Sequence, residues 1–109
     1  MALDMGELAA KMFGAASNVL TGEAPEVLEY AKGEMEKIAR RIVEIGVMPI
    51  DENTPALALN LLKQQKLSSE QLLITVQGLS KQVAQDAINA ALGVVSSTVN
   101  SALGFALLA

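Results

Sequence analysis

The chain has 109 residues, a formal net charge of −4 at pH 7 and a pI near 4.7. This charge argues against a nucleic-acid partner, because such partners require a basic surface. Cys and His are absent, which excludes disulfides, thiolate chemistry and the commonest general base and metal ligand. Hydrophobic residues make up 51% of the chain, its mean hydropathy is +0.37 and only three residues are aromatic. This composition and length predict a single all-α domain of about four helices over residues 1–109.

The first part of the chain predicts an amphipathic helical hairpin over residues 1–48. Between residues 3 and 20, apolar side chains recur every three or four positions, and Gly22 suits the end of a helix. A second helix is expected from about Pro25 to residue 47, because Pro is tolerated in a first turn and the apolar residues again keep helical spacing. Its opposite face is densely charged, which predicts a surface exposed to water.

Two charged clusters of the hairpin predict solvated surfaces rather than binding sites. Glu23, Glu26 and Glu29 follow an i, i+3 rhythm. Without His, they fit the start of a helix better than a carboxylate metal centre. The basic residues at positions 37, 40 and 41 are interleaved with Glu residues, which predicts an ion-paired, water-exposed face that includes Glu34.

A loop is predicted over residues 49–55, where two Pro residues enclose an Asp/Asn cluster. Thr54 followed by Pro55 suits the start of a helix, as an N-cap and a first helical residue. A short helix is therefore predicted over about residues 55–66.

A long C-terminal helix is predicted after this short one. Ser68, with Gln71 three residues later, matches a capping box and predicts a last helix from about residue 69 to residue 109. A continuous helix of that length would measure on the order of 60 Å. A bend is therefore expected, with the Gly residues at positions 78, 93 and 104 among the candidates.

The last 23 residues carry no charge and contain one short phrase twice. Residues 89–95 read Asn-Ala-Ala-Leu-Gly-Val-Val, and residues 100–106 read Asn-Ser-Ala-Leu-Gly-Phe-Ala. The offset of eleven residues is close to three helical turns, so corresponding residues are expected on one face of a helix. Such a repeated face predicts packing against a long partner helix or against copies of the same chain.

The predicted contact seam combines small and polar residues with Leu. Small residues let helix backbones approach closely, and Asn or Ser in a dry seam forms hydrogen bonds that set the register. Hydroxyl side chains in this helix are otherwise expected to bond a backbone carbonyl one turn earlier. The expected self-association residues are Asn89, Leu92, Gly93, Ser96, Asn100, Leu103 and Gly104.

These features predict a non-enzymatic structural protein that self-associates through its C-terminal helix into an oligomer, tube or filament. No cofactor, metal ion, small-molecule substrate or nucleic acid is expected. One alternative is a membrane-active protein, such as a holin-like protein, a pore former or a helical toxin, because residues 87–109 are long enough for membrane contact. Another alternative is a small helical binding module or chaperone whose groove takes a partner helix.

The start of the chain bears on its location. It is acidic and lacks the basic region of a signal peptide, so a cytoplasmic location is the default expectation. Signal-less export and membrane association are the alternatives.

Overall fold

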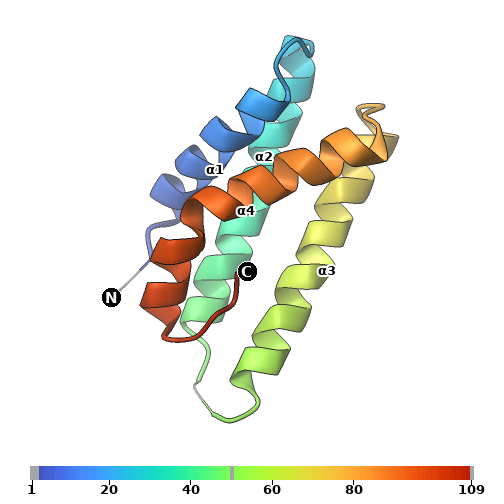
Figure 1. Cartoon of the computed structure of the whole chain (residues 1–109). Coiled ribbons are helices and arrows are strands. Elements are labelled where there is room, and N and C mark those ends of the chain that lie inside the picture. The colour runs from blue at the N-terminus through green and yellow to red at the C-terminus, as the bar shows by residue number, and fades with distance from the viewer. Residues whose placement is uncertain (1–2, 50, 109) are drawn as a thin grey trace.

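Four helices joined by short connections make up the architecture of the computed structural model, which describes residues 3–49 and 51–108 (Figure 1). They are α1 (Met5–Val19), α2 (Pro25–Gly46), α3 (Thr54–Thr75) and α4 (Lys81–Leu103). No strand occurs in the described part of the chain. The prediction of an all-α fold with four helices is therefore confirmed.

The helices α1 and α2 form the predicted amphipathic pair and lie side by side (Figure 1). The Asp4 side chain caps α1 by accepting a hydrogen bond from the Glu7 amide at 2.9 Å, which satisfies one of the free N–H groups of the first turn. Pro25 occupies the first turn of α2, where the helix needs no N–H donor. The apolar stripe of α2 is covered by its neighbours, with Met35 and Ile42 completely buried.

The connection before α3 is held by the hydroxyl group of Thr54. The helix begins at Thr54, one residue earlier than predicted, and Asn53 takes the N-cap position. The buried Thr54 hydroxyl accepts a hydrogen bond from the Asp51 amide at 2.9 Å and donates one to the Pro49 carbonyl at 2.8 Å. These bonds tie the described residues of the connection to the start of α3.

The boundary between the last two helices differs from the predicted one. Ser68 and Gln71 start no helix, because both lie inside α3, which is 22 residues long. The segment 56–77 contains neither Gly nor Pro, so no residue in it interrupts the propagation of the helix. The predicted end of the short helix 55–66 and the predicted bounds of the helix 69–109 are therefore wrong.

The break between α3 and α4 lies at Gly78, one of the predicted bends. Its φ of +71° is in the left-handed region, which favours Gly. The Leu79 amide then turns back to bond the Leu73 carbonyl at 3.3 Å. Ser80 caps α4 by accepting a hydrogen bond from the Val83 amide at 3.2 Å, so a new helix starts in a new direction.

The helix α4 ends before the apolar segment does. Gly104 has a φ of +80° and its amide bonds the Asn100 carbonyl at 3.0 Å, which is a common way for a helix to stop. Leu107 and Leu108 lie beyond the helix and are buried. The expected helix face therefore does not continue through the second copy of the repeated phrase. Ala109 lies outside the described residues.

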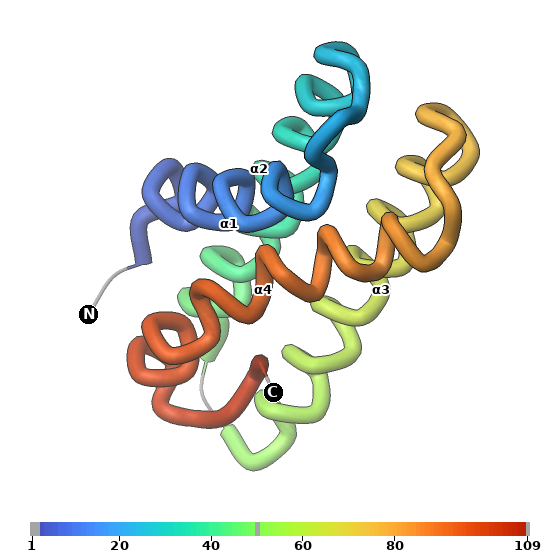
Figure 2. Tube along the Cα trace, turned by 45° about the horizontal axis from the view of Figure 1, so that its top comes forward, coloured from blue at the N-terminus to red at the C-terminus, as the bar shows by residue number. Residues whose placement is uncertain are grey.

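The four helices share one apolar core. The helix α4 crosses the bundle and makes its largest contact with α1, which also packs against α2 (Figure 2). In the described part of the chain, α3 contacts α2 and α4 but not α1, so it lies at the edge. The molecule measures 43 × 22 × 19 Å. This peripheral position of α3 leaves part of the α3 and α4 surfaces uncovered.

Candidate docking groove

An open groove runs between α3 and α4, and three of the seven predicted self-association residues line it. Two adjoining cavities of about 330 Å³ and about 340 Å³ form this α3–α4 groove, because they share Lys63, Lys66 and Asn89 as lining residues. The full lining comprises Leu59, Leu62, Lys63, Lys66, Leu67 and Glu70 from α3, Gln85, Ile88, Asn89, Leu92 and Gly93 from α4, and Leu107 and Leu108 from the C-terminal tail.

The floor of the groove is apolar and belongs to the core of the protein. Leu62, Ile88 and Leu92 are buried and pack within the shared apolar cluster. Leu59 and Leu67 stand at the edge, where 52% and 56% of their surfaces are exposed. Exposed apolar side chains beside a concave apolar surface are typical of an interaction site.

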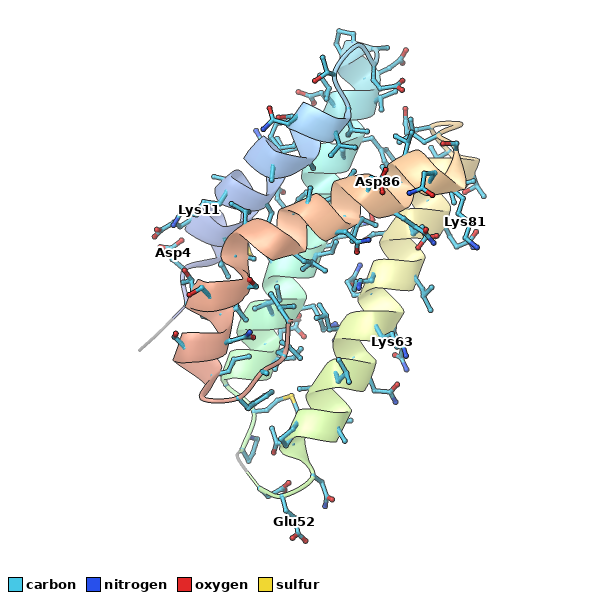
Figure 3. All side chains as sticks on the ribbon, in the orientation of Figure 1. Asp4, Lys11, Glu52, Lys63, Lys81 and Asp86 are labelled. Carbon is cyan, nitrogen blue, oxygen red and sulfur yellow. The ribbon has the colours of Figure 1, made fainter. Side chains whose placement is uncertain are left out.

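The edge of the groove is cationic. Lys63 extends from α3 into solvent (Figure 3), and Lys66 is partly exposed. Neither lysine forms an ion pair with any residue that the structure describes. At the other end of the groove, the Gln85 side-chain amide donates a hydrogen bond to Glu70 Oε1 at 3.1 Å and links α4 to α3. The groove thus presents positive charge on a protein whose net charge is −4.

Gly93 leaves one wall of the groove without a side chain. It lies in the middle of α4, and a Cβ atom at this position would meet no atom within 4 Å. Its φ is not positive, and Gly in a helix interior is about 0.5–1 kcal/mol less favourable than Ala. No contact within the described chain therefore requires Gly here, whereas a second backbone approaching α4 would.

Asn100, a predicted seam residue, binds the tail of its own chain. Its Oδ1 accepts hydrogen bonds from the amides of Leu107 and Leu108 at 3.0 and 2.9 Å, and its Nδ2 donates one to the Leu108 carbonyl at 2.7 Å. These three bonds hold the tail against the end of the α3–α4 groove, where Leu107 and Leu108 form part of the lining.

The other predicted seam residues do not share one surface. The Ser96 hydroxyl donates to the Gly93 carbonyl at 3.1 Å, which confirms the expected bond to the preceding turn. Leu103 lies beside the end of α2, where its Cδ2 atom is 3.6 Å from the Cβ position of Gly46. Gly104 ends the helix. The structure therefore gathers Asn89, Leu92 and Gly93 in the groove and gives the remaining four residues roles within the chain.

Sequence reasoning missed the half of the groove that α3 provides. The sequence predicts no role for Lys63 or Lys66, because residue spacing within one helix does not specify which helix packs beside it. One signal was present: Leu57, Leu59 and Leu67 surround these lysines in sequence and cannot all face one core. All three have at least half of their surface exposed in the structure, so α3 is apolar on more than its buried side.

Glu34 is buried, although the sequence predicts it on the water-exposed face of α2. Its side chain is only 3% exposed, and its Oε2 accepts a hydrogen bond from the Lys37 ammonium group at 2.9 Å. The other carboxylate oxygen, Oε1, has no hydrogen-bond partner in the described structure. The bond to Glu34 is the main reason why the pKa of Lys37 is raised above its ordinary value. Glu34 lines no part of the groove.

Two further cavities carry none of the seven predicted residues. One of about 470 Å³ lies between α1 and α2, and one of about 190 Å³ lies between α1 and α4. Among residues 3–49 and 51–108, no group of three or more acidic side chains is arranged to hold a metal ion. Within the same residues, none of the helices has the length and hydropathy of a membrane span.

The fold and the groove together define a small all-α protein with an open, apolar, cation-edged surface between its last two helices. Comparisons with models of known families, with curated proteins and with solved structures found no match.

Proposed function

We propose that this chain is a non-enzymatic structural protein that self-associates through its last helix, with the α3–α4 groove as the surface that receives a second copy. Repetition of this contact builds an oligomer or a filament. The observation that carries the proposal is the position of Asn89, Leu92 and Gly93 in the wall of an open apolar groove. Gly93 is compatible with it, because a Gly in the lining of the groove lets a second backbone approach α4 closely.

The charge distribution favours a second copy as the occupant of the groove. Residues 1–52 hold ten Asp or Glu and five Lys or Arg, whereas residues 53–109 hold two Asp or Glu and three Lys. The acidic half of one copy therefore complements the cationic edge of the groove in another. Complementary charges of this kind guide association and fix the relative orientation of the partners.

The test is the particle mass of the full-length chain in detergent-free buffer, measured by light scattering over a range of concentrations. We expect a mass above the 11.4 kDa of one chain that rises with concentration. Gly93→Leu should return the mass to that of one chain, because the new side chain occupies the space through which the partner backbone approaches. Circular dichroism should report an unchanged helix content, since Leu is a better helix former than Gly.

Gly14→Leu is the matched control. Gly14 is also an exposed helical Gly with no atom within 4 Å of its Cβ position, but it lies on α1 outside the groove. It should assemble like the wild type. A wild-type chain that stays monomeric at every concentration would overturn the proposal and favour a binding module for another protein. Assembly that Gly93→Leu leaves unchanged would exclude the groove as the contact.

A further inference from the structure

We infer that the α3–α4 groove receives the end of a second copy at which α2 and α3 meet, so that copies join head to tail. This inference rests on the proposed function and names the segment that docks. The docking segment, called the α2–α3 end, comprises Val47, Glu52 and Leu57, which all lie at one end of the bundle.

The α2–α3 end combines the two properties that the groove requires. Among the residues that the structure describes, Val47 is the most exposed large apolar one, at 80%, and Leu57 is half exposed. Glu52 adds a carboxylate that extends into solvent at the tip of the bundle (Figure 3). Apolar side chains beside a free carboxylate complement an apolar floor with lysines at its edge.

Hydrogen bonds hold the described residues of the α2–α3 end. The Asn53 amide donates to Asp51 Oδ1 at 2.8 Å, and the buried Thr54 hydroxyl joins the Asp51 amide to the Pro49 carbonyl. A segment held in this way loses little conformational entropy on docking, which favours association. The Asp51 carboxylate takes part in these bonds, whereas that of Glu52 is in no ion pair or hydrogen bond among the described residues.

The other acidic end of the molecule lacks the apolar component. Glu23, Glu26 and Glu29 are exposed around the connection between α1 and α2. Between residues 20 and 30, which contain these glutamates, no large apolar side chain has more than half of its surface exposed. Ion pairs at a solvated surface contribute little free energy of association by themselves. This acidic end is therefore a weaker match for an apolar groove than the α2–α3 end.

The two matching surfaces lie on different parts of one chain. Glu52 is at the tip of the bundle and Lys63 is on the side of α3 (Figure 3). Contact between two copies through these surfaces is heterologous: each copy uses its end toward one neighbour and its groove toward the next. Such contacts produce a closed ring or an open filament rather than a two-fold dimer.

Reversal of the charges tests this assignment. Glu52→Lys and the double variant Lys63→Glu/Lys66→Glu should each weaken assembly about tenfold or more, because each places like charges at the contact. An equimolar mixture of the two should assemble again, since every contact in it pairs opposite charges. Particle mass by light scattering is the readout for each variant and for the mixture. Glu29→Lys is the matched control, because it makes the same charge change at the other acidic end and should leave the mass unchanged.

The outcomes separate this inference from the proposed function. If Gly93→Leu and the double lysine variant dissociate the assembly but Glu52→Lys does not, the groove remains the contact and the α2–α3 end is excluded as its occupant. If neither charge-reversal variant assembles by itself and their mixture also fails, the head-to-tail pairing is excluded. A monomeric wild-type chain overturns both the inference and the proposed function.

Discussion

The Asn100 side chain determines where the chain goes after α4. Its amide bonds three backbone groups of the buried residues Leu107 and Leu108. The Leu107 amide also bonds the Phe105 carbonyl at 3.1 Å, so the amide and carbonyl of Leu108 depend most on Asn100. The local sequence pattern predicts the same residue in a seam between helices. An Asn side chain can form hydrogen bonds across such a seam or with the backbone of its own chain equally well. The choice depends on Gly104, which ends the helix and brings the tail within reach of Asn100.

Asn100→Leu should therefore destabilise the chain and loosen its tail. The substitution leaves the amide and the carbonyl of Leu108 without their partner, and we expect a loss of about 1–3 kcal/mol in the free energy of unfolding. Urea unfolding measures this loss, and hydrogen exchange of the Leu107 and Leu108 amides reports the tail itself. Asn60→Leu, at an exposed position on α3, is the control and should change neither quantity appreciably. Unchanged amide protection in Asn100→Leu would contradict the proposed role of this side chain.

Lys37 and Glu34 should make the stability dependent on alkaline pH. The pKa of Lys37 is raised in the folded chain, chiefly by its hydrogen bond to Glu34. The stabilisation is therefore fully present below the pKa of Lys37 in the unfolded chain, and it is lost as pH rises through the higher folded value. Urea midpoints measured between neutral pH and about pH 11 should fall at the alkaline end, beyond the ordinary Lys value of about 10.4.

Two variants isolate this contribution from that of the other lysines. Lys37→Met should lower the midpoint at neutral pH, because it leaves the Glu34 carboxylate buried without a cation. It should also reduce the alkaline fall. Lys37→Arg should keep its charge through this range and likewise show a smaller fall. An alkaline fall of equal size in all three proteins would show that the pair makes no contribution to it.

At the scale of elements, two Gly residues decide the form of the C-terminal half in opposite ways. Gly78 ends α3 through a left-handed φ, whereas Gly93 continues α4 and exposes its backbone to the groove. Neither Cβ position has a neighbour within 4 Å. The two glycines therefore differ in backbone conformation and not in the space around their Cβ positions. Comparing the same substitution at both sites thus tests the effect of backbone conformation.

Substitution by Ala should change stability in opposite directions at these sites. Gly78→Ala should lower the free energy of unfolding by about 1–2 kcal/mol, because Ala is strained at positive φ. Gly93→Ala should raise it by about 0.5–1 kcal/mol, because Ala is the better residue in a helix interior. Urea unfolding of the two variants beside the wild type measures both effects. A change of the same sign in both would contradict this account of the two helices.

At the scale of the whole molecule, the peripheral position of α3 creates the α3–α4 groove. Contact with α2 and α4 would bury the apolar surface of a helix that had one narrow apolar face. The helix α3, however, also carries Leu57, Leu59 and Leu67 on its exposed side. The same molecule is acidic in residues 1–52 and slightly basic in residues 53–109. Exposed apolar residues and this division of charge together favour the proposed contact, in which the α2–α3 end of one copy enters the α3–α4 groove of another.

Local pattern predicted some elements well and others poorly. The first two helices follow from apolar spacing and from Pro25, because an amphipathic helix and its caps are encoded within a few residues. Ser68 and Ser80 look alike as capping residues in sequence, yet only Ser80 caps a helix. The difference lies in Gly78, whose left-handed turn must come first, and in the uninterrupted run that carries α3 past Ser68.

By itself the sequence determined that the fold is all-α and where its first two helices lie. It also determined that Asn89, Leu92 and Gly93 share one face of the last helix. These features follow from helical periodicity, which depends on neighbours along the chain. Only the tertiary structure decided that α3 stands at the edge, that Glu70 meets Gln85 across a groove, that Glu34 is buried and that Asn100 binds its own tail. The physical reason is that each of these outcomes depends on which elements pack together, and the spacing of residues within one helix does not specify its neighbours.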